Sequence, residues 1–211
     1  VTVHGQFGRQ DVKASHVVVA TGGCAANPRL FEELHGVPLY AQTAYPTSLG
    51  SGLILGMSAG AAIVGAEKYA CLPGLIPDAY RYPCQMFAYA PLNPAARSPW
   101  ELVVNARGER FVREDHPSVH QIERGIYRQP GHRHWAIFDA DMLEKSDPII
   151  PDWTRERIAK EHQSNPMFHS AMSLNELAFR AGLDPAGLAT TVNDYNHSIA
   201  IGGTDAYGRV F

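Results

Sequence analysis

The sequence has 211 residues, of which 45% are hydrophobic and 18% charged, and its formal net charge at pH 7 is −3. This balance is typical of a folded globular chain. Without a strong excess or a long run of one charge, neither nucleic acid nor an anionic membrane is expected as the main partner. No apolar run reaches the roughly 18 residues that a membrane-spanning helix needs.

The three cysteines, Cys24, Cys71 and Cys84, are widely spaced and form no CxxC pair. We therefore predict no structural zinc and no other metal site. Buried free thiols are typical of proteins in a reducing compartment, so we expect a cytoplasmic location.

The first third of the chain alternates strand and helix signals. Residues 1–7 alternate as a strand does, and residues 16–20 form the continuous β-branched run expected of a strand buried on both faces. Thr21-Gly22-Gly23 ends that strand. A helix is predicted from Asn27, as its cap, to Gly36. Residues 49–65 predict a glycine turn that leads into a helix of small residues.

The amino-acid composition changes in the middle of the chain. Residues 72–99 are rich in proline and tyrosine and show no helical period, which predicts a crossing between two structural units. Residues 100–104, a turn at 105–108 and a return strand at 110–112 predict a hairpin.

Helical signals dominate the rest. Val119, Ile122 and Ile126 have helical spacing, and residues 135–138 predict a buried strand. Ser173 and Glu176 form a capping box, and a last helix is predicted to begin at Asp184-Pro185 and to end at Gly202-Gly203.

Five of these stretches, in this order, resemble the flavoprotein family of fumarate reductases, succinate dehydrogenase flavoprotein subunits and ketosteroid dehydrogenases. They read VVVATGGCAANPRL, GSGLILGMSAGAA, LVVNARGERFVRED, SLNELAFRAGLDPAGLATTVNDYN and GGTDAYGR. The resemblance implies an α+β fold, in which a partial FAD-binding α/β segment (residues 1–70) joins a fumarate-reductase-type capping, or substrate, domain (residues 71–211).

The resemblance also implies the cofactor, FAD, and the residues near it: Ala20, Thr21, Gly22, Gly23, Gly50, Ser51 and Gly52. Glycine has no β-carbon, so a backbone at these turns can approach a ligand closely. Ser51 stands where the family usually has Asp and cannot supply its negative charge. A plain tight turn between strand and helix stays open as the alternative for residues 20–23.

The residues that fumarate-reducing members use are not carried over. Their histidine before a Pro-Thr pair corresponds to Ala90 before Pro91, their Thr-Glu pair has no clear counterpart, and their acid arginine falls near Ser118. We therefore do not expect a fumarate reductase.

A polar cluster after the hairpin supplies the candidate catalytic residues His116, Ser118 and His120, since histidine can transfer protons near neutral pH. Tyr89 is a further candidate proton donor. The alternatives are a solvated loop in which Glu114 pairs with Arg110 or Arg113, and a tyrosine that belongs to the core. His132 and His134 would lie on one side of a strand, but no third ligand supports a metal there.

The leading hypothesis is an internal segment of an FAD-dependent oxidoreductase that moves a hydride between the flavin and a small organic or polycyclic substrate. The chain begins with Val1 and contains no GxGxxG fingerprint, so we expect flanking FAD-binding segments to be missing and the segment alone to be inactive. The alternative is a non-catalytic ligand-binding or interaction domain on the same scaffold. The sequence around this segment, with or without the fingerprint, would separate the two.

Overall fold

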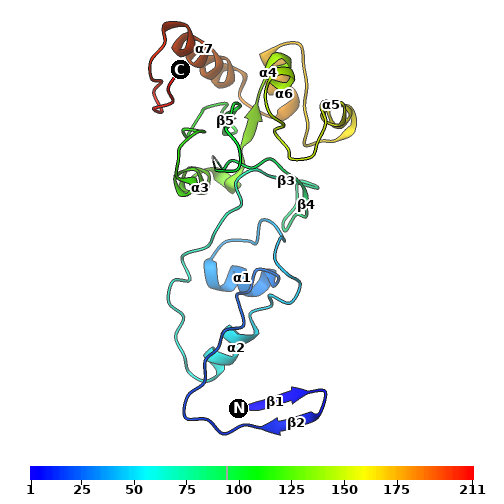
Figure 1. The fold of residues 1–211 in the computed structure, drawn as a ribbon, viewed down its shortest axis with the longest axis vertical. Helices are drawn as coiled ribbons and strands as arrows, with labels where there is room; N and C mark the ends of the chain where they lie inside the picture. The colour runs from blue at the N-terminus through cyan, green and yellow to red at the C-terminus, as the bar shows by residue number, and fades with distance from the viewer. Residues whose placement is uncertain (94) are drawn as a thin grey trace. The chain divides into compact units, whose positions relative to one another are not determined.

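The computed structural model describes residues 1–93 and 95–211, and the chain divides into two compact units. The first unit comprises residues 1–39 and 43–68, and the second comprises residues 40–42 and 69–211. Figure 1 shows both units as mixtures of helices and strands, in agreement with the expected α+β class.

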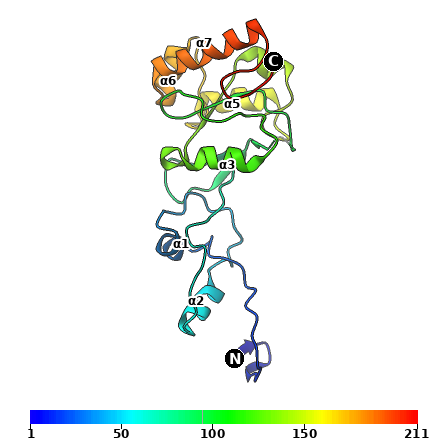
Figure 2. The same cartoon turned by 90° about the vertical axis from the view of Figure 1, so that its left-hand side faces the viewer.

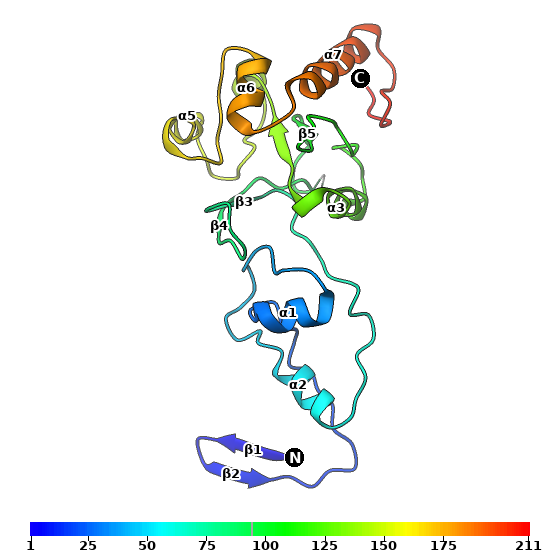
Figure 3. The same ribbon diagram turned by 180° about the vertical axis from the view of Figure 1, so that it is seen from behind.

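The first unit begins with a hairpin in which β1 (Thr2–Gly5) pairs antiparallel with β2 (Gly8–Asp11). Its helices are α1 (Pro28–His35) and α2 (Ser51–Ser58), which Figure 3 shows from behind. The predicted ends of α1 are confirmed. Its first turn is capped because the Asn27 side chain accepts a hydrogen bond from the Leu30 N–H, and the helix ends at Gly36 with φ +69°.

Two predictions for this unit are wrong. Residues 16–20 form no strand, and Val18 is 90% exposed, because no described segment pairs with this run and a strand needs a neighbour to satisfy its backbone. The helix predicted within 49–65 ends at Ser58, and Gly60 then adopts φ +87°, which does not continue a helix.

The second unit contains the remaining elements. In chain order they are β3 (Leu75–Pro77), β4 (Met86–Tyr89), β5 (Leu102–Val104), α3 (Val119–Tyr127), a 3₁₀ turn (Pro130–His132), β6 (Trp135–Ile137), α4 (Ala140–Lys145), α5 (Arg155–Ser164), α6 (Leu174–Ala181) and α7 (Pro185–Ile201). None of the helices in the described residues is long and apolar enough to cross a membrane. Strands β3 and β4 form an antiparallel pair within the predicted crossing, where no strand was predicted.

Strand β5 lies at the centre of the second unit and pairs antiparallel with β6. Its side chains alternate between two cores, as strand geometry requires. Val103 packs with Ile122 and Ile126 of α3, whereas Leu102 and Val104 pack with α6 and α7. Figure 2 shows α6 and α7 following one another in orange and red. The predicted return strand at 110–112 is reduced to one bridge, between Val104 and Arg110.

A third core joins β4 to α5, through Ala88, Ile158 and Trp153 among others. The turn of the predicted hairpin is confirmed, and it packs against the start of α7. Gly108 has φ +70°, and a β-carbon there would lie 2.3 Å from the Leu188 nitrogen. The Ser173 hydroxyl caps α6 by accepting from the Glu176 N–H, as the capping box predicts.

Candidate functional site

The turn that follows residues 16–20 presents bare backbone. Residues 20–23 are all exposed. Gly22 has φ +77°, and β-carbons built at Gly22 and Gly23 would meet no atom within 4 Å. A ligand can therefore approach the main chain of this turn directly.

The second glycine turn, at the start of α2, packs against the first. A β-carbon at Gly52 would lie 2.1 Å from Thr21 Oγ1 and 2.5 Å from Val19 Cγ1, so only glycine fits there without movement. Gly50 has φ +79°, and its β-carbon would lie 2.9 Å from that of Cys24. The structure thus brings the two groups of predicted cofactor-binding residues together.

The N-terminus of α2 faces this junction with free hydrogen-bond donors. Gly50 is its N-cap, and no described side chain caps the helix. The first N–H groups of a helix have no partner within it, and they carry a partial positive charge that favours an anion. Ser51 is exposed and adds one hydroxyl. The residues present therefore fit a phosphate-bearing cofactor with close backbone contact.

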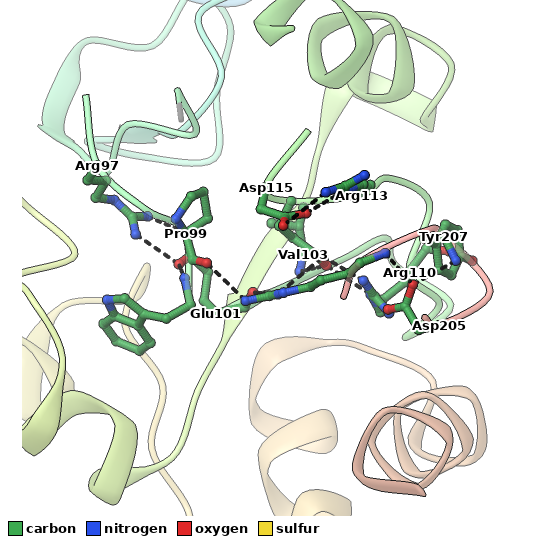
Figure 4. Close-up of polar contacts among 12 residues, drawn as sticks. Arg97, Pro99, Glu101, Val103, Arg110, Arg113, Asp115, Asp205 and Tyr207 are labelled. Carbon is green, nitrogen blue, oxygen red and sulfur yellow. Dashed lines mark hydrogen bonds and ion pairs between the residues drawn. The ribbon is translucent and has the colours of Figure 1, made fainter. Parts of the chain in front are cut away.

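In the second unit, four buried charged residues connect the loop after β5 to the C-terminal segment: Arg110, Glu114, Asp205 and Arg209 (the ionic network). Glu114 accepts from Arg110 Nε at 2.9 Å and Nη2 at 2.6 Å. Asp205 accepts from Arg110 Nη1 at 2.6 Å, and Arg209 reaches Glu114 at 3.4 Å. Figure 4 shows Arg110 beside Asp205, and Arg113 paired with Asp115 nearby.

Within the ionic network, Asp205 and Arg110 are held in their charged forms. Burial alone raises the pKa of Asp205, but the hydrogen bond and charge of Arg110 outweigh it, so the pKa lies below its ordinary value. Burial alone would lower the pKa of Arg110, and its carboxylate partners raise it instead. The alternative of a solvated loop is thus wrong for Arg110 and Glu114, although their predicted pairing is present.

The four candidate catalytic residues lie around the start of α3 and at the end of β4. His116 and Ser118 precede α3, and the Ser118 N–H donates to His116 Nδ1 at 3.0 Å. His120 is exposed on α3 and pairs with Glu123 at 2.9 Å. Tyr89 ends β4, where burial and the charge of Glu123 raise its pKa. His116 lies outside the helix, so it does not share a helical face with His120.

Glu123 and Cys71 were not identified from the sequence. The Cys71 thiol donates to the Glu123 carbonyl, and burial together with the Glu123 charge raises the pKa of Cys71 to about 11. His120, Tyr89 and Cys71 therefore all interact with one helical residue, and no local motif marks it. Residues 1–93 and 95–211 contain no group of three or more His, Cys, Asp or Glu that could hold a metal ion.

A family model described as FAD binding domain matches residues 3–209. The chain belongs to this FAD binding domain family. Its cofactor is therefore FAD, as the resemblance implied. The match covers both units and includes every candidate residue.

Curated relatives of the chain are flavoprotein oxidoreductases. The probable fumarate reductase Ifc3 of Shewanella frigidimarina is 25% identical over 98% of this chain and 32% of its own length. The 3-oxosteroid 1-dehydrogenase of Mycolicibacterium smegmatis is 28% identical over 90% of this chain and 38% of its own length. The chain thus spans about a third of the length of these relatives.

Solved structures show the same fold. The open conformation of a flavocytochrome c3 fumarate reductase covers 99% of this chain with a TM-score of 0.56 at 24% identity. The 3-ketosteroid delta1-dehydrogenase of Sterolibacterium denitrificans, solved with 1,4-androstadiene-3,17-dione, covers 89% with a TM-score of 0.59 at 21% identity. The chain covers 34% and 33% of those proteins.

Proposed function

We propose that this chain is part of an FAD-dependent oxidoreductase that moves a hydride between the flavin and a small organic or polycyclic substrate. The observation that supports it best is the packing of Gly52 against Thr21, which joins the exposed turn at residues 20–23 to the N-terminus of α2. FAD, when bound, supplies the hydride donor or acceptor. The protein binds the cofactor, positions the substrate and provides protons.

In this proposal, residues 1–70 form the FAD-binding part. The backbone of residues 20–23 lies against the cofactor, and Gly50, Ser51 and Gly52 direct the free N–H groups of α2 at its phosphates. The exposed valines at 17–19 support flanking FAD-binding segments in a longer protein, with which this run would pair as a strand.

Residues 71–211 form the capping, substrate-binding part of the proposal. The Ser118 N–H donates to His116 Nδ1, so the neutral ring carries its proton on Nε2. We place that Nε2–H at the substrate as a hydrogen-bond donor that stabilises the charge developing there as the hydride moves. The raised pKa of Tyr89 keeps its hydroxyl protonated, which suits a donor, and His120 is a second candidate with Glu123 as partner.

The substrate in this proposal is not fumarate. Ala90 has no titratable group where the fumarate-reducing pattern has histidine, and Ser118 stands near the position of the acid arginine. A serine hydroxyl is too weak an acid to replace arginine as the group that protonates the substrate. It also carries no positive charge with which to bind a dicarboxylate.

Flavin binding by a protein that contains the whole chain tests the cofactor part. Gly52→Ala forces the new β-carbon into Thr21 and Val19, and we expect a loss of flavin affinity of about tenfold or more. Gly56→Ala is the matched control on α2, because the nearest neighbour of the new β-carbon would lie 3.7 Å away. This variant should bind flavin as the unchanged protein does. Equal affinity in the two variants would contradict the proposed site.

Reduction of the bound flavin, followed by reoxidation with a panel of unsaturated acids and ketosteroids, tests the reaction. Turnover of one panel member, lost in His116→Ala but retained in His197→Ala, supports the oxidoreductase. His197 is exposed on α7 and serves as the control. Tight flavin binding with no redox turnover would instead favour the ligand-binding domain.

A further inference from the structure

The second unit contains a cavity of about 540 Å³, and none of the four candidate catalytic residues lines it. Its wall comes from β3, β6, the start of α4 and the segment that leads into α6. Met172, which is 99% exposed, and Tyr80, which is 55% exposed, belong to this wall. The cavity therefore reaches the surface, and a ligand can enter it from solvent.

The wall is mainly apolar and borders the core around α5. Three isoleucines of that core line the cavity while staying 2–4% exposed: Ile149, Ile150 and Ile158. Trp135, Phe138 and Phe168 add aromatic side chains. Aromatic side chains bury a large apolar area and prefer to pack on other rings. The composition of the wall thus favours a ligand that is itself aromatic.

The acidic and phenolic groups of the wall already have partners. Among the described lining residues the acids are Glu101, which Arg97 binds through both oxygens, and Asp139, which caps α4. The Tyr80 hydroxyl donates to the Pro166 carbonyl at 3.4 Å. No lysine or arginine is among the described residues of the wall. A charged ligand would thus find no unpaired counter-ion in it.

The three histidines of the wall, His134, His162 and His169, add no charge at pH 7. Burial lowers the pKa of His134 to about 4, and it also lowers the pKa values of His162 and His169. The His134 ring has a hydrogen bond with the backbone of His132. The histidines therefore give no reason to expect an ionic ligand.

The size of the cavity makes it costly to leave empty. The free-energy cost of an apolar cavity rises with its volume, because the surrounding atoms lose their packing contacts. An engineered apolar cavity of roughly 150 Å³ stays free of water and binds benzene. The cavity described here is more than three times as large and lies within the usual range for small-molecule sites. A ligand of two or three rings would restore the missing contacts.

From these observations we propose that the cavity is a binding site for an uncharged aromatic molecule of two or three rings. The ligand is held by packing against the aromatic and aliphatic wall, and the site requires neither a hydrogen bond nor an ion pair from it. It is contained in the second unit and does not depend on FAD.

Two fluorescent compounds with one carbon skeleton test the charge requirement: N-phenyl-1-naphthylamine, which is uncharged, and 1-anilinonaphthalene-8-sulfonate. Both become brighter in apolar surroundings, so each is titrated against a protein that contains the whole chain. We expect the uncharged compound to bind at least about tenfold more tightly, because the sulfonate would lose water without gaining a partner. Tighter binding of the sulfonate would contradict this, and would point to Arg133, whose guanidinium lies 4.6 Å from the centre of the Tyr80 ring.

Variants locate the binding. Ala171→Phe and Leu143→Trp enlarge two partly exposed side chains of the wall from different segments, and each should weaken binding of the uncharged compound about tenfold or more. Phe179→Ala is the control, because Phe179 is 85% exposed on α6 and does not line the cavity. It should bind as the unchanged protein does. Urea unfolding checks that each variant is folded.

The proposal is overturned if the uncharged compound does not bind the unchanged protein, or if the sulfonate binds as tightly. It is also overturned if folded Ala171→Phe and Leu143→Trp both keep full affinity, or if Phe179→Ala abolishes binding. The comparison of the two compounds needs no variant, so it decides the question even where a substitution prevents folding.

Discussion

The ionic network gives the sharpest stability prediction, through Glu114→Gln. Glu114 is 1% exposed and accepts from Arg110, from Arg209 and from the Val103 N–H at 3.1 Å. The substitution preserves the shape but removes one of two negative charges that balance two buried arginines. Removing one partner of a buried ion pair typically costs about 3–5 kcal/mol of unfolding free energy. Two lost charge-assisted hydrogen bonds, at about 1.5–3 kcal/mol each, lead to a similar range.

Glu109→Gln is the matched control. Glu109 pairs with Arg107 at 2.8 Å in the same hairpin, but the two side chains are 50% and 75% exposed. An exposed pair contributes little to stability because solvent screens it. The two variants therefore make the same substitution in a glutamate that pairs with an arginine, and they differ mainly in how deeply that glutamate is buried.

Urea unfolding followed by tryptophan fluorescence measures both variants, because Trp100, Trp135 and Trp153 all lie in the second unit. With a slope of about 2 kcal/mol per molar urea, Glu114→Gln should lower the midpoint by roughly 2 M. Glu109→Gln should lower it by less than about 0.5 M. If both variants unfold at the same urea concentration, the ionic network does not stabilise the second unit in the way argued.

Three further results are expected. Gly187→Ala should destabilise the second unit despite the higher helix propensity of alanine, since the new β-carbon would lie 1.9 Å from the Arg107 carbonyl oxygen; a raised melting temperature would refute this. The lowered pKa values of Asp205 and Asp115 stabilise the fold above the ordinary carboxyl pKa of about 3.9 and cease to do so as the pH falls through the folded values, so the urea midpoint should drop as the pH falls below about 5 rather than on the alkaline side. Cys71, with a pKa of about 11, should resist iodoacetamide at pH 7 by mass spectrometry, and rapid labelling would contradict the raised pKa.

Features set by local sequence were predictable. Asn27 and Ser173 each begin a helix because a short polar side chain accepts from an N–H three residues later. Gly36 and Gly108 adopt positive φ where the sequence predicts a helix end and a turn. In each case the residues that decide the conformation lie within one turn of one another.

Features that depend on contacts between distant parts of the sequence were not predictable. Arg110 and Asp205 pair across 95 residues, and nothing in either segment marks the other as its partner. The same applies to Glu123, which only the fold places near Tyr89 and Cys71. His134, immediately before β6, and His169, in the segment before α6, line one cavity in the second unit, and their spacing in sequence has no period to detect.

At the proposed cofactor site, the conformation of residues 16–20 depends on a pairing partner, whereas the conformation of the turn after them depends on packing within the first unit. The β-branched run is not a strand here, because strand pairing needs a neighbour that the described residues do not provide. The turn keeps its geometry nevertheless, since Gly52 packs on Thr21 and Gly50 on Cys24 within the first unit. The backbone shape at Gly22 therefore does not require a completed sheet. Flavin affinity should accordingly respond to Gly52→Ala even where strand pairing of Val17–Val19 is complete.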